Sequence, residues 1–268
     1  MRIIIDTRQT VEQNAALYYE RAKKAKRKLE GTKRAIAKTR DLLAKEAAGL
    51  AEKPTARVAK GPIRKRDWFE AFRWFYSSDG FLCIGGRDAT TNEVVIKKHA
   101  LEGDAIFHTD MAGSPFVVVK SDGKEIPVST REEAAMFTAC ASRAWKSGAG
   151  SIEVFGARPD QVSKTPNPGE YMPKGAFVVR GARDQYRVQP SYAVGKDAEG
   201  RVMGGPQTAV LKHCEMAFSI LQGEEKASDV AKRLAHNLEI PIDDALRALP
   251  PGNVKFGKRL TASKAQDQ

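Results

Sequence analysis

Cysteine is scarce in this chain of 268 residues, which contains only Cys83, Cys140 and Cys214. Their wide spacing includes no CxxC pair, which argues against a zinc ribbon or a disulfide framework and is typical of reduced thiols. No apolar run approaches the ~18–20 residues that a membrane-spanning helix needs, and the apolar run at the start is too short for a secretory signal. We therefore expect a cytoplasmic protein with no membrane partner.

Motifs for catalysis are also missing. The sequence has no Walker motif and no nucleophile elbow, and Gly85-Gly86 is too short for a dinucleotide-binding loop. The four histidines show no metal-ligand spacing. The sequence thus predicts a protein that is not an enzyme and that binds neither a cofactor nor a metal.

Net charge is distributed very unevenly along the chain. Residues 11–66 hold 17 Lys/Arg against 6 Asp/Glu, a balance of +11, whereas the whole chain sums to +12. Clustered cations gain affinity for polyanions by displacing counterions from phosphates. A solvated helix face that is basic for solubility is the alternative, but the local clustering favours contact with nucleic acid, and with RNA in particular.

Residues 11–50 are expected to form a helical arm. Thr10 with Gln13 is a capping-box pattern, and a heptad seam runs from Val11 through Leu29 and Ile36 to Leu50. Lysines and arginines cover the other faces, and we take Lys23, Lys24 and Arg27 as RNA contacts. Three arrangements remain open: one helix of ~60 Å, a hairpin at Gly31, or a coiled-coil homodimer.

The remainder of the chain is expected to form an α+β body. Trp68, Phe72 and Phe75 fall at helical spacing, and Thr130 with Glu133 predicts the start of a helix that ends near Lys146. Short apolar runs predict strands at 81–84, 94–97, 105–108, 116–120, 152–155 and 176–180. We expect a mixed, mostly antiparallel sheet with one or two packed helices, preceded by the basic coiled-coil arm.

Several blocks of the body occur in the order and spacing of one family. They are Trp68-Phe69-Glu70-Ala71-Phe72-Arg73-Trp74-Phe75, Ile84-Gly85-Gly86-Arg87-Asp88, His108-Thr109-Asp110 and Gln161-Val162-Ser163-Lys164. These blocks resemble the RNA-binding domain of the NFACT family of ribosome quality-control factors. The arm is similar to the coiled-coil segment that precedes this domain in the family.

The resemblance implies four regions: an arm at 1–50, a basic linker at 51–66, the RNA-binding domain at 67–185 and a C-terminal extension at 186–268. It implies tRNA and the large ribosomal subunit as partners. The chain begins where the family's coiled-coil segment begins, so we expect it to lack the N-terminal domain. A separate N-terminal NFACT protein is then a further expected partner, and peptide tailing by this chain alone is not expected.

Candidate RNA contacts in the body are donors expected on its surface. They are Arg87 in a turn, Lys97 and Lys98 at a strand end, Lys120, and the loop donors Gln161, Ser163 and Lys164. His108 and Asp110 should share one face of a strand. For them a structural hydrogen bond or a contact to a 2′-hydroxyl or phosphate is favoured over catalysis or metal binding.

A different class of function also fits the arm. Its alanine-rich seam needs a helical partner, because an isolated amphipathic helix is marginally stable. The chain would then be an oligomerising scaffold that docks a separate N-terminal half or a ribosomal partner, with RNA contact secondary.

Overall fold

The computed structural model of the chain describes residues 5–8, 10–50, 64–111, 113–165 and 172–261, and gives only the backbone for 42–50. It divides into two compact units, one up to Ile63 and one from Arg64 on. Most of the predicted linker, residues 51–63, lies outside the described residues.

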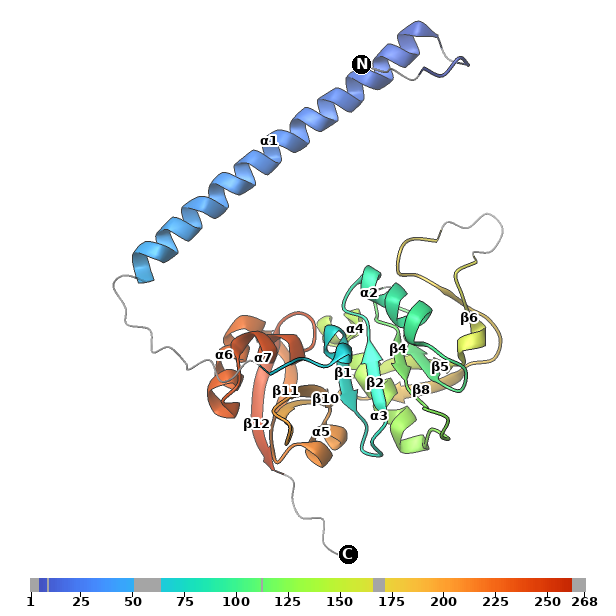
Figure 1. Cartoon of the computed structure of the whole chain (residues 1–268), viewed down its shortest axis with the longest axis vertical. Coiled ribbons are helices and arrows are strands. Elements are labelled where there is room, and N and C mark those ends of the chain that lie inside the picture. The colour runs from blue at the N-terminus through green and yellow to red at the C-terminus, as the bar shows by residue number, and fades with distance from the viewer. Residues whose placement is uncertain (1–4, 9, 51–63, 112, 166–171, 262–268) are drawn as a thin grey trace, which may run out of the picture. The chain divides into compact units, whose positions relative to one another are not determined.

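The first unit is the helix α1 (Val11–Leu50). The predicted capping box forms, because Thr10 N donates to Gln13 Oε1 at 3.0 Å and Gln13 N donates to Thr10 Oγ1 at 3.3 Å. The helix passes through Gly31 without a break. Of the three arrangements of the arm, the hairpin is therefore excluded. Figure 1 shows α1 in blue.

The described residues of the second unit form three antiparallel sheets, so the expected α+β class is confirmed. The largest has the order β1-β2-β4-β3-β5-β8, the next β10-β9-β11-β12, and the smallest pairs β6 with β7. The strands of the largest are β1 (Arg73–Tyr76), β2 (Leu82–Gly85), β3 (Ala105–His108), β4 (Val117–Val119), β5 (Ile152–Ala157) and β8 (Asp184–Val188). The others are β6 (Val162–Ser163), β7 (Val178–Val179), β9 (Tyr192–Lys196), β10 (Val202–Pro206), β11 (Met216–Glu225) and β12 (Val254–Thr261).

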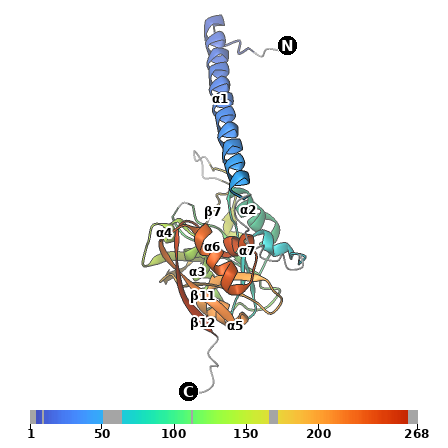
Figure 2. The same cartoon turned by 90° about the vertical axis from the view of Figure 1, so that its left-hand side faces the viewer.

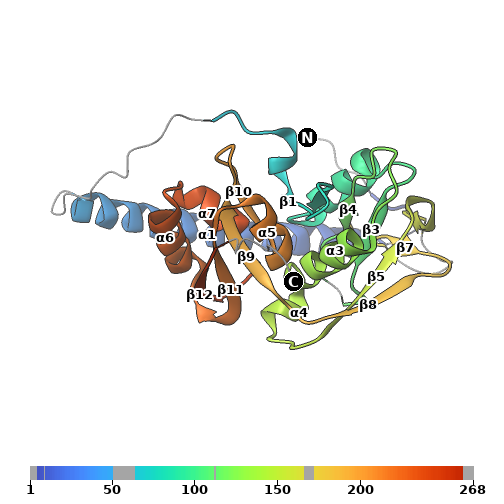
Figure 3. The same ribbon diagram turned by 90° about the horizontal axis from the view of Figure 1, so that it is seen from below.

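Helices cover these sheets, as Figures 2 and 3 show from two further directions. They are α2 (Ala89–Val94), α3 (Val128–Cys140), α4 (Arg143–Lys146), α5 (Gln207–His213), α6 (Ala227–Leu238) and α7 (Ile242–Ala248), with single turns η1 (Trp68–Ala71), η2 (Val95–His99) and η3 (Pro159–Gln161). α3 packs on the largest sheet and α6 on β9, β11 and β12. The sequence dictates this for α6, because its buried residues Val230, Leu234 and Leu238 recur every four positions.

The two larger sheets meet where β1 lies against β10. Tyr76 N donates to Met203 Sδ at 3.3 Å, and one continuous core of buried residues runs from Phe69 to Leu260. The C-terminal segment is therefore packed into the same unit as the domain that precedes it.

The three cysteines are buried and unpaired, and burial raises the pKa of each thiol. No described helix is both long and apolar enough to span a membrane.

Three local expectations were wrong. The helical spacing of Trp68, Phe72 and Phe75 does not continue as a helix: η1 ends at Ala71, and β1 follows because its backbone pairs with β2. Trp68 is 52% exposed, whereas Phe72 and Phe75 are buried.

The strand expected at 94–97 is the end of α2 followed by η2. Asp88 caps α2, since Thr91 N donates to its Oδ1 at 2.8 Å, and this local cap outweighs the apolar run.

The helix expected at Thr130 begins at Val128 instead and is interrupted before α4. Thr130 Oγ1 is used in a tertiary contact 2.7 Å from Asp79 Oδ2 rather than as a cap.

Gly204 provides a test of how tightly the C-terminal segment is packed. A Cβ atom at this position would lie 2.2 Å from the carbonyl oxygen of Ala248 in α7, so Gly204→Ala should destabilise the body by about 1–3 kcal/mol in urea unfolding. Gly150→Ala is the matched control, because its added methyl group meets open space. Equal stability of the two variants would contradict this packing.

Candidate nucleic-acid interface

The predicted RNA contacts of the arm lie on a strongly basic helix surface. All side chains from Arg21 to Arg40 are exposed, and ten of them are cationic. The described ion pairs of this segment, Lys23 with Glu20 and Arg34 with Glu30, are both long at 3.9 Å. Lys24 and Arg27 form no ion pair with a described residue, so their charge remains available to an anionic partner.

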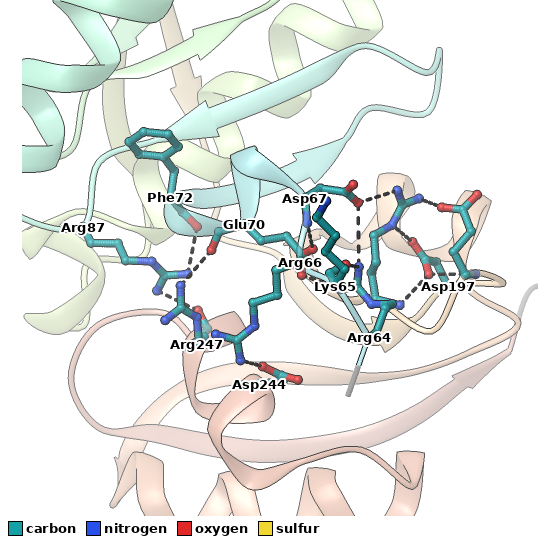
Figure 4. A network of polar contacts seen from close by, with 12 residues as sticks. Arg64, Lys65, Arg66, Asp67, Glu70, Phe72, Arg87, Asp197, Asp244 and Arg247 are labelled. Atoms are coloured by element: carbon teal, nitrogen blue, oxygen red, sulfur yellow. Dashed lines mark hydrogen bonds and ion pairs between the residues drawn. The ribbon is translucent and has the colours of Figure 1, made fainter. Parts of the chain in front are cut away.

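Arg87 is not the surface contact that its place in a turn predicted. Its guanidinium is half-buried and donates to the carbonyl oxygens of Phe72 at 2.8 Å and Arg247 at 3.0 Å, as Figure 4 shows. Burial, together with the like charges of Arg73 and Arg247, lowers the pKa of Arg87 to about 10. The sequence could not show this, because the two acceptors lie 15 and 160 residues away and only the fold brings them to Arg87.

Lys120 is likewise a buried structural residue. Its ammonium group binds Asp104 and donates to the carbonyl oxygen of His99 at 2.8 Å. The same carboxylate accepts Ser121 N at 2.8 Å and Leu101 N at 2.9 Å. A paired, buried lysine of this kind is not available for a phosphate.

The loop donors Gln161, Ser163 and Lys164 are also occupied within the chain. Gln161 Nε2 donates to the carbonyl oxygens of Arg180 and Ala182, at 2.9 and 2.6 Å. Ser163 Oγ accepts from Thr165 N at 3.1 Å. These contacts stabilise the loop itself, so the ordinary structural interpretation of this loop fits better than RNA contact.

Lys164 fixes the segment 173–177 to α2. Its Nζ lies 2.9 Å from Glu93 Oε1 and donates to the carbonyl oxygens of Pro173 at 3.1 Å and Ala176 at 2.9 Å. Gly175 N donates to the same Glu93 oxygen at 3.1 Å. Lys164, the Gly175 amide and Lys97 lower the pKa of the Glu93 carboxyl to about 2. All three ammonium hydrogens of Lys164 thus have acceptors in the chain.

Lys97 and Lys98 are exposed on η2 rather than at a strand end. Lys97 Nζ donates to Glu93 Oε2 at 3.1 Å. Lys98 forms no ion pair with a described residue, which leaves it as the freest of the predicted body contacts.

His108 and Asp110 do not form the predicted hydrogen bond within the described residues. β3 ends at His108, and Asp110 lies beyond it, where its Oδ1 accepts Arg183 Nη1 at 3.1 Å. The imidazole instead stacks on Phe116, with ring centroids 4.0 Å apart. Burial lowers the pKa of His108 to about 4, so the ring is neutral at pH 7. No group of three His, Cys, Asp or Glu side chains in the described ranges is arranged to hold a metal.

A groove of about 490 Å³ lies beside this histidine. Its walls come from the turn that leads into α2, the loop around Gly113, the start of α4 and the segment 173–177, which Lys164 holds. Among the described lining residues the cations are Arg73, Arg87, Arg143, Lys146 and Lys174, against a single carboxylate, Asp88. His108, Phe116 and Phe177 add an aromatic wall. We call this site the basic groove.

Sequence reasoning missed three cationic residues of the basic groove, Arg143, Lys146 and Lys174. All three are exposed, and none forms an ion pair with a described residue. The sequence features that could have pointed to them are the i,i+3 spacing of Arg143 and Lys146, which places both on one helix face, and the position of Lys174 in a polar segment. Gly113, with φ +91°, lets Arg143 approach the backbone, since a Cβ there would lie 3.1 Å from Arg143 Nε.

A second cavity, of about 700 Å³, differs in charge. Four acidic residues, Glu102, Asp104, Asp160 and Asp184, line it beside Arg131 and Arg158. An acidic lining repels phosphates, so the basic groove is the better nucleic-acid site.

Comparison with known proteins agrees with an RNA-binding role. Residues 71–181 match the family model described as "NFACT protein RNA binding domain". The chain is 38% identical to "Archaeal Rqc2 homolog aRqcH" of Methanocaldococcus jannaschii over 217 residues, which is 78% of this chain and 32% of that protein. It is 35% identical to "Ribosome quality control complex subunit NEMF" of Mus musculus over 188 residues, 67% of this chain and 17% of that protein.

The chain therefore spans about a third of the archaeal relative and about a sixth of the mouse relative. Among solved structures it is similar to the C-terminal part of the fibronectin/fibrinogen-binding protein from Streptococcus suis, with 21% identity and a TM-score of 0.39. That similarity covers 68% of this chain and 77% of the solved chain.

Lys164→Met tests whether this lysine supports the groove wall. Removing the ammonium group releases Pro173, Ala176 and Glu93 together, so trypsin should cut after the exposed Lys174 roughly several-fold faster. Mass spectrometry of the fragments measures this rate. Lys124→Met, which removes an exposed turn lysine, is the control and should leave the rate unchanged. An unchanged cleavage rate in Lys164→Met would show that Lys164 does not hold the segment 173–177.

His108 should make stability depend on pH. Its pKa is about 4 in the folded chain and near 6.5 when unfolded, so the unfolded chain binds the proton more readily. The full stability is present above about pH 6.5 and is lost as the pH falls towards 4, by up to about 3 kcal/mol. Urea unfolding of His108→Gln should show a smaller loss over this window. Parallel curves for the two proteins would exclude a neutral His108.

Proposed function

We propose that this chain binds structured RNA through the basic groove and the arm. The premise is that its residues 71–181 are an NFACT protein RNA binding domain. The targets that we propose are tRNA and the large ribosomal subunit, and the proposed setting is quality control of stalled nascent chains. The observation that carries the proposal is the charge of the basic groove, where five cations stand against one carboxylate among the described lining residues.

The groove offers the two kinds of contact that structured RNA uses. Arg143, Lys146 and Lys174 supply exposed charges for phosphates, and they are not engaged by described carboxylates. The neutral His108 and Phe177 supply flat surfaces, on which unpaired bases of RNA stack. The groove is about 490 Å³, large enough for a base with its phosphate and too small for a duplex.

The arm adds a long, sequence-independent surface for the RNA backbone. Its ten cationic side chains between Arg21 and Arg40 extend over ~30 Å of helix. Such a surface contributes affinity and orientation rather than sequence recognition. We propose that the groove selects the RNA element and that the arm strengthens its attachment to the ribosome.

The ribosomal setting rests on the relatives. The mouse protein and one from Schizosaccharomyces pombe, 32% identical over 191 residues, are named as subunits of the ribosome quality control complex. Within the described residues, nothing in the groove or arm is arranged for a reaction, so we propose binding rather than catalysis.

Salt dependence of RNA binding tests both surfaces. Affinity for tRNA and for purified large subunits is measured between roughly 50 and 300 mM salt for the whole chain and three variants. Removal of one cation that binds a phosphate should lower the slope of log K against log salt by about 0.7–0.9. We expect this for Arg143→Gln and Lys174→Gln in the groove, and a larger decrease for Lys23, Lys24 and Arg27 changed together to Gln.

Lys232→Gln is the matched control, because it removes an exposed lysine of α6 that is paired with Asp229 at 3.0 Å. Its slope should equal that of the unchanged protein. If the groove variants bind as well as the control, the groove is not the RNA site.

The scaffold function stays as a second candidate, favoured by one observation. Leu29 and Ile36 of the arm seam are 55% and 49% exposed. If the arm variants keep the salt slope, and the mass in sedimentation rises with concentration, the arm would serve self-association rather than RNA contact.

A further inference from the structure

Four arginines converge where the RNA-binding domain meets the C-terminal segment. Arg66 and Arg73 come from the start of the domain, Arg87 from the turn before α2, and Arg247 from α7. Together with Gly204 and Tyr192 they line a small cavity of about 20 Å³. Figure 4 shows Arg66, Arg87 and Arg247 beside one another, with Arg66 directed towards Asp244.

The guanidinium groups are held mainly by neutral backbone oxygens. Arg73 Nη1 donates to the carbonyl of Leu249 at 2.9 Å, and Arg247 Nη2 donates to that of Glu70 at 2.8 Å. Arg87 donates to two more carbonyls, and its Nε is buried with no hydrogen-bond partner in the described structure. Each group has five N–H donors, so most of this capacity remains unused.

Charge in the cavity is not balanced by the described residues. Its lining includes two carboxylates, but Glu70 is bound by Arg64 and by Asp67 N, and Asp244 is bound by Arg66. Arg73, Arg87 and Arg247 form no ion pair with a described residue. Half-buried like charges at short range are unfavourable unless an anion lies between them.

We propose that this cavity is a phosphate-oxygen site, in which one oxygen of a phosphate group is bound by Arg73, Arg87 and Arg247. A volume of about 20 Å³ holds one water-sized atom, so a single oxygen enters and the rest of the group stays at the mouth beside the exposed Arg66. The ligand is either inorganic phosphate or a phosphate of bound RNA. The first would fasten the C-terminal segment to the domain, and the second would extend the RNA contact beyond the groove.

Thermal unfolding of the full chain distinguishes the two sources. Inorganic phosphate is titrated at constant ionic strength, without RNA. A saturable rise in Tm of roughly 3–5 °C at about ten times the dissociation constant is expected if free phosphate binds. Arg247→Gln and Arg66→Gln should abolish this rise, and Arg143→Gln in the basic groove should keep it. General salt effects act on all variants alike, so the difference between variants isolates the site.

If an RNA phosphate is the ligand, Tm is unchanged by free phosphate, while Arg66→Gln and Arg247→Gln lower the salt slope of RNA binding by about 0.7–0.9. Arg66→Gln is included because Arg247 also supports the fold through Glu70. An equal rise in Tm in all variants, or no response in either assay, would overturn the proposal. The outcome is independent of the basic groove, since the groove variants leave the arginine cavity intact.

Discussion

The hydrogen bonds of the Arg87 guanidinium join three segments of the chain, one of them 160 residues away in sequence. One side chain donates to the carbonyl of Phe72, just before β1, and to that of Arg247, at the end of α7. It thereby fixes the turn that leads into α2, one wall of the basic groove, relative to the C-terminal segment. A guanidinium suits this position because its planar fork reaches two acceptors at once and keeps its charge when half-buried. The groove and the arginine cavity share this group, since Arg73 and Arg87 line both.

The chain uses its positive charges in two distinct ways. Lys120 and Lys164, like Arg87, are engaged by internal acceptors and act as structural cross-links. Arg143, Lys174 and most of the arm cations have no such acceptors among the described residues. Binding of a polyanion at the basic groove and the arm draws on the second group, because an unpaired, hydrated cation is free to replace the counterions of a phosphate. The net charge of +12 is therefore a poor guide to polyanion binding. Several cations of the body are engaged internally, whereas the free cations are concentrated on the arm.

Much of the fold could be predicted from local patterns. The arm helix with its capping box, the strands around 81–84, 105–108, 116–120 and 152–155, and the apolar face of the helix that contains Phe137 all depend on periodicity and caps. The errors came where a nearer interaction prevailed: the Asp88 cap turned an expected strand into α2, and pairing with β2 made Arg73–Tyr76 a strand. Of the predicted body contacts, Lys98 is exposed without a described ion pair, whereas the structure engages Arg87, Lys120, Gln161 and Lys164 internally.

Local sequence was enough to establish the general organisation of this protein: a helical arm with the excess charge, an α+β body, and the blocks that mark an RNA-binding domain. These properties follow from neighbours within a few residues of each other, so they can be recognised without coordinates. Which cations are free became clear from the packed fold alone. Whether a lysine or arginine meets a carboxylate, a carbonyl or solvent depends on segments that only the fold brings together, as with Arg87 and the carbonyl of Arg247, 160 residues away. For that reason Arg143 and Lys174 emerged as groove residues only when the α4 turn, the segment 173–177 and the α2 turn were brought together.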